Sequence, residues 1–298
     1  TETSGIAEIV ADESFAPIID QQIMVFEALN SEAYITPVYA SEAEAYDLFM
    51  KDSVQLIFGT RELTANELQI LKDRKQKART QIIAVDGVAL IVNKANSDTL
   101  ITVNDLKRIM TGEIRSWKDL NPKSNLGEIA VSFDSPKSSI VRYIKDSVCG
   151  GQPLGDNVKA RSADLISYDL DSITPNQKVI DFVASTPNAL GIIGVNWISN
   201  PGDSTNLSFI DKIRVMSVTN ESKAFSDNTY KPFPYQLALK KYPLRRDLYV
   251  IISDVRGGLP SGFVKFVAGD QGQRIILKSG LYPGTSPTRL VRINATAN

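Results

Sequence analysis

The stretch Val54–Glu67, VQLIFGTRELTANE, decides the fold of this chain. Its first part, Val54–Gly59, is almost wholly apolar, as expected of a strand buried on both faces of a parallel sheet. The segment Thr64–Glu67 has the Thr-x-x-Glu pattern of a capping box, which predicts that a helix begins there. Thr60 and Arg61 occupy the turn between the two. A buried strand followed by a capped helix is the repeating unit of α/β proteins.

The same kind of pattern recurs on both sides of this stretch. Strands are predicted at Ile6–Ala11, Tyr34–Tyr39, Ile129–Phe133 and Leu190–Val195, and helices from Pro17, Ser41, Ser138 and Thr174. Alternation of strands and helices predicts an α/β fold with a largely parallel sheet.

Two places in the chain are expected to cross between lobes. Near Asp86, a turn dipeptide breaks an apolar run into two predicted strands. Near Tyr235–Tyr242, the predicted strands Phe233–Leu239 and Leu248–Ser253 carry the chain back. We therefore predict two discontinuous lobes with a ligand cleft between them: residues 1–86 and 236–298 form lobe I, and residues 87–235 form lobe II.

The composition excludes most kinds of catalysis. The chain has 298 residues, which favours two domains, and its 33 Lys and Arg nearly balance its 34 Asp and Glu. A general nucleic-acid binder would carry a basic excess. There is no His and a single Cys, Cys149, which removes His-dependent catalysis, His- or Cys-based metal sites and internal disulfides. The composition leaves carboxylate chemistry, Lys or Tyr chemistry, or no chemistry at all. With the resemblance described below, we expect no enzyme activity, no cofactor and no metal site.

Hydroxyl side chains and arginines gather where the predicted strands end and helices begin. In open α/β sheets, ligands bind at these carboxyl ends, where free N–H groups and helix dipoles favour an oxyanion. Ser and Thr add hydroxyl donors, and Arg adds a bidentate fork. The candidate residues are Ser14, Phe15, Ser41, Thr60, Arg61, Ser138, Ser139 and Arg142.

Each candidate also has a purely structural interpretation. Ser and Thr at helix starts are commonly N-caps, and Phe15 fits a hydrophobic staple. Arg61 could be a surface cation near Glu62, and Arg142 could pair with Asp146 one turn on. Recurrence at the same topological place favours the oxyanion site, but spacing alone leaves both interpretations open.

The segment Leu106–Leu120, LKRIMTGEIRSWKDL, resembles a segment of the phosphate-binding proteins of ABC transporters. Shorter matches follow the order of that family, at Ala11–Pro17, Ile57–Leu63, Leu190–Val195 and Tyr242–Leu244. Together they span nearly the whole chain. The combination is similar to a variant of the family found in Bacteroidetes-type bacteria, which is often anchored to the membrane by an N-terminal lipid.

The resemblance implies a periplasmic-binding-protein type II fold. In this fold, two α/β lobes with central mixed sheets are joined by a two-strand hinge and close on an oxyanion. Position by position, the resemblance assigns ligand contacts to Ser14, Phe15, Ser41, Thr60, Ser138 and Ser139.

Two departures from the family pattern bear on the site. The second-lobe pattern Arg-x-Asp-Gly-Ser-Gly-Thr is Ser132–Ser138 here, so its Arg is missing, and Pro136 has no N–H to donate. The Asp that the family uses to accept the proton of hydrogen phosphate is replaced by Arg61. We hypothesise that Arg61 and Arg142 supply the missing charge. Three carboxylates are candidates to accept a ligand proton: Asp12, Glu13 and Asp134.

The resemblance implies a solute-binding protein without catalysis that captures inorganic phosphate for the permease of an ABC importer. We expect a monomer that binds no nucleic acid, located in the periplasm or on the cell surface and held to the membrane at most by an N-terminal lipid. The chain starts without the regions of a signal peptide and has no apolar stretch of transmembrane length, which fits either a cytosolic protein or a mature or trimmed exported one. The resemblance implies the mature or trimmed exported form. Two alternatives stay open. One is a binder of another oxyanion (sulfate-like or a small organic phosphate), and the other is a surface adhesion or sensing protein.

Overall fold

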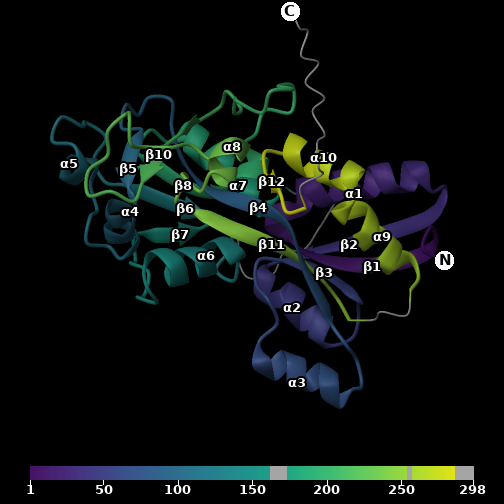
Figure 1. Ribbon diagram of the computed structural model, residues 1–298. Helices are drawn as coiled ribbons and strands as arrows, with labels where there is room; N and C mark the ends of the chain where they lie inside the picture. Colours follow the sequence, from purple (N-terminus) through teal and green to yellow (C-terminus); the bar gives the residue numbers. More distant parts are fainter. Residues whose placement is uncertain (162–172, 254–256, 286–298) are drawn as a thin grey trace, which may run out of the picture.

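The computed structural model describes residues 1–161, 173–253 and 257–285, and its first part alternates strands and helices as predicted (Figure 1). The elements are β1 (Ser4–Asp12), the short helix η1 (Glu13–Phe15), α1 (Ala16–Leu29), β2 (Glu32–Ala40), α2 (Glu42–Met50), β3 (Leu56–Gly59) and α3 (Ala65–Asp73). β1 lies between β2 and β3 and is parallel to both. All of β3 is buried, and Thr64 and Glu67 form the predicted capping box. We call these strands and their helices the β1 side.

The long strand β4 (Arg79–Val92) leads into a second group of elements, the β6 side. Its strands are β5 (Leu100–Thr102), β6 (Ala130–Phe133), β7 (Val158–Ala160), β8 (Ala189–Gly194), β9 (Arg214–Val215) and β10 (Ser217–Thr219). Its helices are α4 (Val103–Met110), α5 (Trp117–Leu120), α6 (Ser139–Tyr143), η2 (Ile144–Val148), α7 (Pro175–Ser185), η3 (Val195–Trp197) and α8 (Pro234–Ala238). β6 is parallel to β7 and β8.

The chain then returns to the β1 side through β11 (Arg245–Ile252), followed by α9 (Leu259–Ala268), α10 (Asp270–Lys278) and β12 (Tyr282–Pro283). The main sheet has the order β2-β1-β3-β11-β4-β8-β6-β7, with β11 antiparallel to β3 and β4. The sheet is therefore mixed, and β4 and β11 occupy its middle (Figure 1).

Two predictions at the crossing are wrong. Asp86 and Gly87 form no turn, because β4 runs straight through them: it pairs with β11 up to Gly87 and with β8 from Val88 onward. Glycine is needed there, since a Cβ at position 87 would lie 2.7 Å from Cβ of Pro232. The predicted strand Phe233–Leu239 is instead helix α8, with Pro234 in its first turn.

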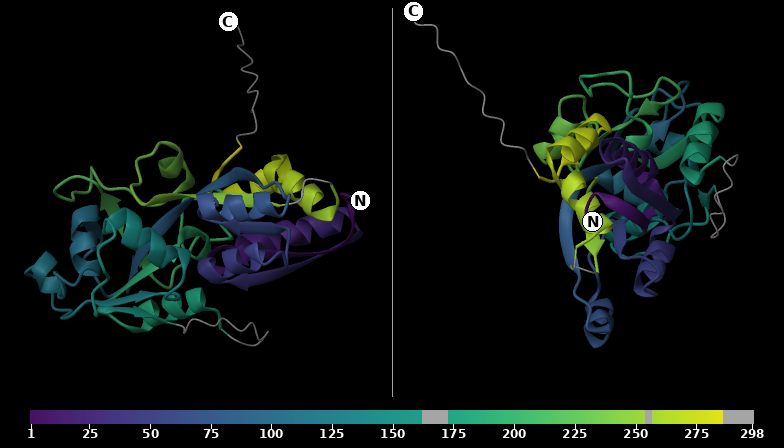
Figure 2. Two further views of the ribbon diagram at one scale, coloured as in Figure 1. Left: turned by 90° about the horizontal axis from the view of Figure 1, so that it is seen from below. Right: turned by 90° about the vertical axis from the view of Figure 1, so that its right-hand side faces the viewer.

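Packing joins the two sides near the sheet centre, although the molecule is elongated (Figure 2). One buried cluster combines Phe15 and Ile18 of the β1 side with Val179 and Ile193 of the β6 side. A second cluster, around Trp117, consists of residues from the β6 side and the crossing strands. The start of α1 is therefore held against the β6 side, which fixes the loops described next.

Candidate functional site

Loops from both sides meet at the carboxyl ends of the parallel strands. Ser14 follows β1, and Ser139 begins α6 after β6; both residues are fully buried. Their hydroxyl oxygens lie 3.4 Å apart, and Oγ of Ser14 lies 3.5 Å from Oδ2 of Asp134. The structure therefore brings together residues from two strand ends, Ser14 after β1 and Asp134 with Ser139 after β6.

Arg246 of β11 reaches the same point from the sheet centre. The residue is 6% exposed; its Nε donates to Oδ2 of Asp86 at 2.8 Å, and its Nη1 donates to Oγ of Ser139 at 2.8 Å. The guanidinium carbon lies 5.0 Å from the centre of the Phe15 ring. Nη2 is buried, and none of the residues that the structure describes forms a hydrogen bond with it. A buried cation with a spare donor is suited to hold an anionic group.

Carboxyl groups surround this cation. Burial, with Glu42 nearby, raises the pKa of Asp12 to about 7. Burial and then the charge of Asp134 raise the pKa of Glu13 well above its ordinary value, and burial also raises the pKa of Asp134. One oxygen each of Asp12 and Glu13 is buried and has no hydrogen-bond partner in the described parts of the chain. Asp12 is therefore placed to take up a proton close to neutral pH, and burial favours the protonated forms of Glu13 and Asp134 as well.

The β6 side holds the η1 loop in place. Asn196 Nδ2 and the Trp197 ring nitrogen donate to the carbonyl oxygen of Ser14 at 2.9 and 2.8 Å. The side-chain amide of Asn176 donates to Glu13. The position of Ser14 is therefore set by residues from beyond its own part of the sheet.

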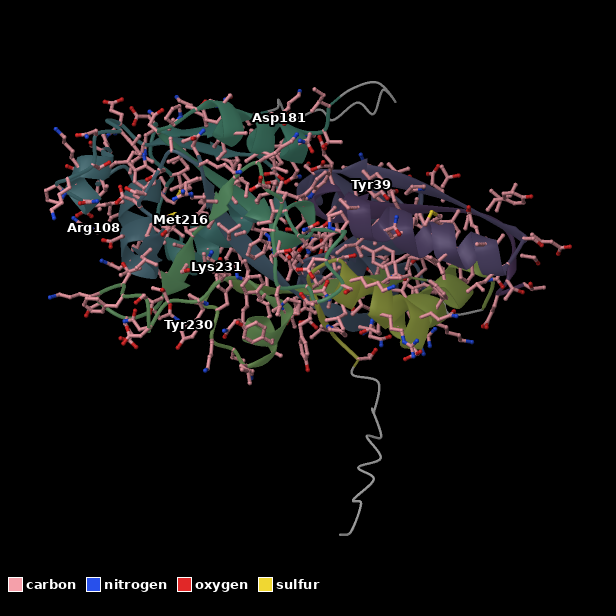
Figure 3. All side chains as sticks on the ribbon, turned by 90° about the horizontal axis from the view of Figure 1, so that it is seen from above. Tyr39, Arg108, Asp181, Met216, Tyr230 and Lys231 are labelled. Atoms are coloured by element: carbon pink, nitrogen blue, oxygen red, sulfur yellow. The ribbon has the colours of Figure 1, made fainter. Side chains whose placement is uncertain are left out.

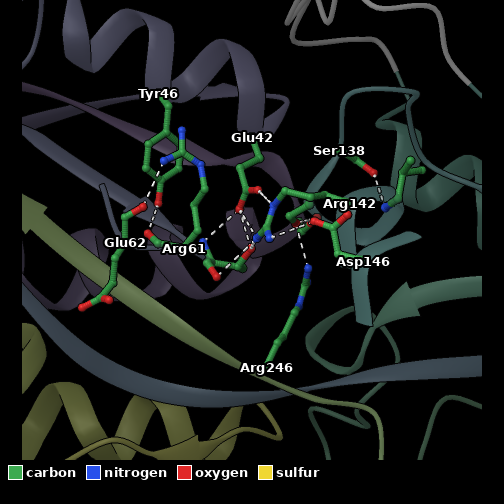
Figure 4. A network of polar contacts seen from close by, with 12 residues as sticks. Glu42, Tyr46, Arg61, Glu62, Ser138, Arg142, Asp146 and Arg246 are labelled. Carbon is green, nitrogen blue, oxygen red and sulfur yellow. Dashed lines mark hydrogen bonds and ion pairs between the residues drawn. The ribbon is translucent and has the colours of Figure 1, made fainter. Parts of the chain in front are cut away.

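Thr60 and Arg142 come together around Glu42. Figure 4 shows Arg142 beside Glu42. The N–H and hydroxyl of Thr60 and the guanidinium of Arg142 all donate to this carboxylate. These hydrogen bonds lower the pKa of Glu42, although burial alone would raise it. Ser41 adjoins this group at the predicted helix start, but its hydroxyl donates to Glu44 at 2.8 Å and makes no capping bond.

Arg61 is not part of either group. Its guanidinium donates twice to Glu67, at 2.8 and 2.9 Å, and its Cζ lies 3.7 Å from the centre of the Tyr46 ring. Figure 4 shows the Arg61 guanidinium beside Tyr46, away from Arg246. The hypothesis that Arg61 supplies charge to the site therefore lacks support from the geometry, because its fork is already used by a carboxylate of the neighbouring helix.

Two predicted residues have clear structural roles. Ser138 is the N-cap of α6 and accepts a hydrogen bond from the N–H of Val141 at 3.2 Å. Phe15 is fully buried at the start of α1 and packs in the shared core. Both hold the helix starts at which Ser14 and Ser139 meet.

Arg246 and its partner Asp86 were not among the site residues predicted from the sequence. Arg246, Leu248 and Val250 alternate on the buried face of β11. Period-two alternation would therefore have assigned Arg246 to this face, but the predicted strand began two residues later, at Leu248. A charged residue on the buried face of a strand was the signal that could have identified it.

In the part of the chain that the structure describes, no helix is long and apolar enough to cross a membrane.

The chain matches known proteins along most of its length. The PBP superfamily domain matches residues 1–271. The phosphate-binding protein PstS of Borreliella burgdorferi is 24% identical over 279 residues, covering 92% of this chain and 88% of the relative. The phosphate-binding protein PstS of Staphylococcus aureus is 24% identical over 281 residues, covering 92% of this chain and 77% of the relative.

Solved structures share the fold. A Clostridium perfringens structure with bound phosphate, assigned to the substrate-binding proteins of phosphate ABC transporters, has a TM-score of 0.75 at 19% identity, covering 94% of this chain and 99% of that one. An ABC-type phosphate transport receptor from Vibrio cholerae has a TM-score of 0.64 at 20% identity, covering 93% and 99%. The predicted periplasmic-binding-protein fold and the resemblance to phosphate-binding proteins are thereby confirmed. The chain belongs to the PBP superfamily.

Proposed function

We propose that this protein captures inorganic phosphate between two lobes and delivers it to the permease of an ABC importer. The lobes are residues 1–86 with 236–298, and residues 87–235. Strands β4 and β11, paired at Asp86 and Arg246, would act as the hinge between them. The named function of the relatives supports the ligand, and the site chemistry supports an oxyanion.

One observation carries the proposal. The hydroxyls of Ser14 and Ser139 lie 3.4 Å apart, and Arg246 donates to Ser139 with a further nitrogen to spare. One donor therefore comes from each lobe and one from the hinge. A buried oxyanion needs such donors, because burying a charge without partners is costly.

We assign the phosphate contacts to Ser14, Ser139, Arg246 and the N–H groups at the starts of α1 and α6. Phe15 and Ser138 would hold those helix starts. Thr60, Ser41 and Arg142 would support the rim of the cleft through Glu42 and its neighbours. Arg61 is left out of the ligand set, because Glu67 already binds its guanidinium.

Proton acceptance would provide selectivity. Hydrogen phosphate carries a proton at neutral pH, whereas sulfate carries none. An ionised Asp12 can accept a hydrogen bond from a protonated ligand and repels an unprotonated one. Glu13 and Asp134 are the other candidate acceptors. Since the pKa of Asp12 is raised to about 7, the preference for phosphate over sulfate should increase from pH 6 to pH 8.

Calorimetric titration with phosphate and with sulfate tests this function. We expect the parent protein to bind phosphate more tightly than sulfate. Asp12→Asn should reduce the difference in affinity between phosphate and sulfate. The Asn side chain still accepts a hydrogen bond from the Ser14 N–H, and it adds an N–H donor that can bind sulfate. Absence of phosphate binding by the folded parent protein would refute the proposal, and stronger binding of sulfate would favour another oxyanion as ligand.

A role in transport also implies where the protein works and in which form. The protein would work outside the cytoplasm, in the periplasm or on the cell surface, as a monomer and without catalysis. Closure of the lobes around the ligand would create the form that the permease recognises.

A further inference from the structure

Glu42 is a buried carboxylate that groups from both proposed lobes bind at once. Its side chain is 3% exposed and lies at the start of α2 in lobe I. The N–H of Thr60, also in lobe I, donates to Oε2 of Glu42 at 3.0 Å. Nε of Arg142, in lobe II, donates to Oε1 of Glu42 at 2.5 Å.

Arg142 also contacts lobe I beyond this carboxylate. Its Nη2 donates to the Thr60 hydroxyl at 2.9 Å and to the Thr60 carbonyl at 3.3 Å. Close by, the N–H of Ala43 donates to the carbonyl of Lys137 at 3.4 Å. The two proposed lobes are therefore joined by several bonds between protein groups, apart from those of Ser14, Ser139 and Arg246.

The donors around Glu42 are those that the sequence assigned to the ligand. Thr60 and Arg142 donate hydrogen bonds to a carboxylate of the chain itself, that of Glu42. The carboxylate balances the charge of Arg142, so this group does not attract a second anion. Glu42 and Arg142 instead form an ion pair between the two proposed lobes.

We propose that the Glu42–Arg142 pair is an interlobe latch that stabilises the closed form and slows phosphate release. This proposal rests on the proposed function for its ligand and its lobes. When only a fraction of the protein is in the form that binds ligand, the apparent affinity is reduced by that fraction. If the closed form is the one that holds phosphate, a latch that favours closure raises the affinity for phosphate. Glu42 is the buried partner, so removing Arg142 would leave a buried carboxylate without its opposite charge, which is costly.

Two single variants separate a latch from a simple effect of charge. Glu42→Gln removes a negative charge near the anion site, whereas Arg142→Gln removes a positive one. Electrostatics alone would make phosphate bind more tightly in the first variant and more weakly in the second. A latch requires that both variants release phosphate faster, by about tenfold, and that the double variant is no faster than the faster single.

Arg108→Gln is the matched control. Arg108 pairs with Glu113 at 2.8 Å inside lobe II, and its side chain is 40% exposed against 37% for Arg142. Arg108 lies at the outer end of lobe II, far from Tyr39 of lobe I (Figure 3). Its removal should change the release rate by less than about twofold, as is usual for exposed pairs.

The release rate is measured by stopped flow with inorganic phosphate, and closure by the distance between spin labels. The labels are placed by Asp47→Cys and Lys145→Cys, two exposed positions on opposite lobes, in a Cys149→Ala background. We expect both latch variants to populate longer distances than the parent without phosphate. Opposite changes in release rate, or unchanged rates with unchanged distances, would overturn the latch. Failure of the parent to bind phosphate, with longer distances in both variants, would uphold the latch and refute the proposed function.

Discussion

Replacing Arg246 by Lys should weaken phosphate binding strongly. In the structure, one guanidinium nitrogen binds Asp86 and a second binds Ser139, while the third is buried and has no partner among residues 1–161, 173–253 and 257–285. Lysine keeps the positive charge, but its compact head group replaces this fork. Loss of one charged hydrogen bond to the ligand costs about 1.5–3 kcal/mol, which corresponds to a roughly 10- to 150-fold weaker affinity.

Calorimetry in phosphate-free buffer measures this change. Circular dichroism and thermal melting must show that Arg246→Lys is folded, because Asp86 and Ser139 each depend on the lost fork. Arg61→Lys is the control, since it makes the same replacement in the same lobe at a guanidinium bound to Glu67. If folded Arg246→Lys binds phosphate as tightly as the parent, Arg246 does not contact the ligand and our site assignment is wrong.

Four further outcomes are expected. Arg61→Ala should change phosphate affinity by less than about twofold in calorimetry, because Glu67 holds its side chain in place; a tenfold loss would return Arg61 to the site. Ser139→Ala should weaken phosphate binding up to about tenfold by the same assay, through loss of a hydroxyl donor, and an unchanged affinity would contradict its role. The melting temperature should fall as the pH rises from about 4 to about 7 and then level off, because Asp12 keeps its proton up to about pH 7 in the folded protein but loses it at lower pH in the unfolded chain. Asp12→Asn should reduce this pH dependence. An unchanged pH dependence would assign the effect to other carboxyl groups. Thr64→Ala should lower the free energy of unfolding in urea by about 1 kcal/mol through loss of the capping box, and no change would show that the cap adds nothing.

Local sequence patterns predicted most of the fold. The apolar run before Thr60 and the capping box at Thr64 act within a few residues, so they survive in any tertiary context that buries the strand. The same holds for Ser138, which caps α6 as its position before an apolar helix predicted. Errors arose where a neighbouring segment overrode a local signal. The dipeptide at Asp86 suggested a turn, but pairing with β11 and β8 keeps β4 extended through it.

The candidate site could be predicted only in part. The hydroxyls of Ser14 and Ser139 were identified because strand ends in an α/β sheet converge at one edge. The sequence could not tell which arginine would reach them. Arg61 and Arg142 follow strand ends as Ser14 does, yet Glu67 and Glu42 bind them. Arg246 lies within a strand and was overlooked.

By itself, the sequence determined the repeating strand–helix units, the absence of His, and the hydroxyl donors at the strand ends. The tertiary structure decided which charges face the site and which are already paired. The deciding contacts join residues far apart in the chain: Ser14 with Ser139 over 125 positions, Arg246 with Asp86 over 160, and Arg142 with Glu42 over 100. No pattern of three or four residues encodes such pairs, because they form only when β4 and β11 bring the two sides of the sheet together.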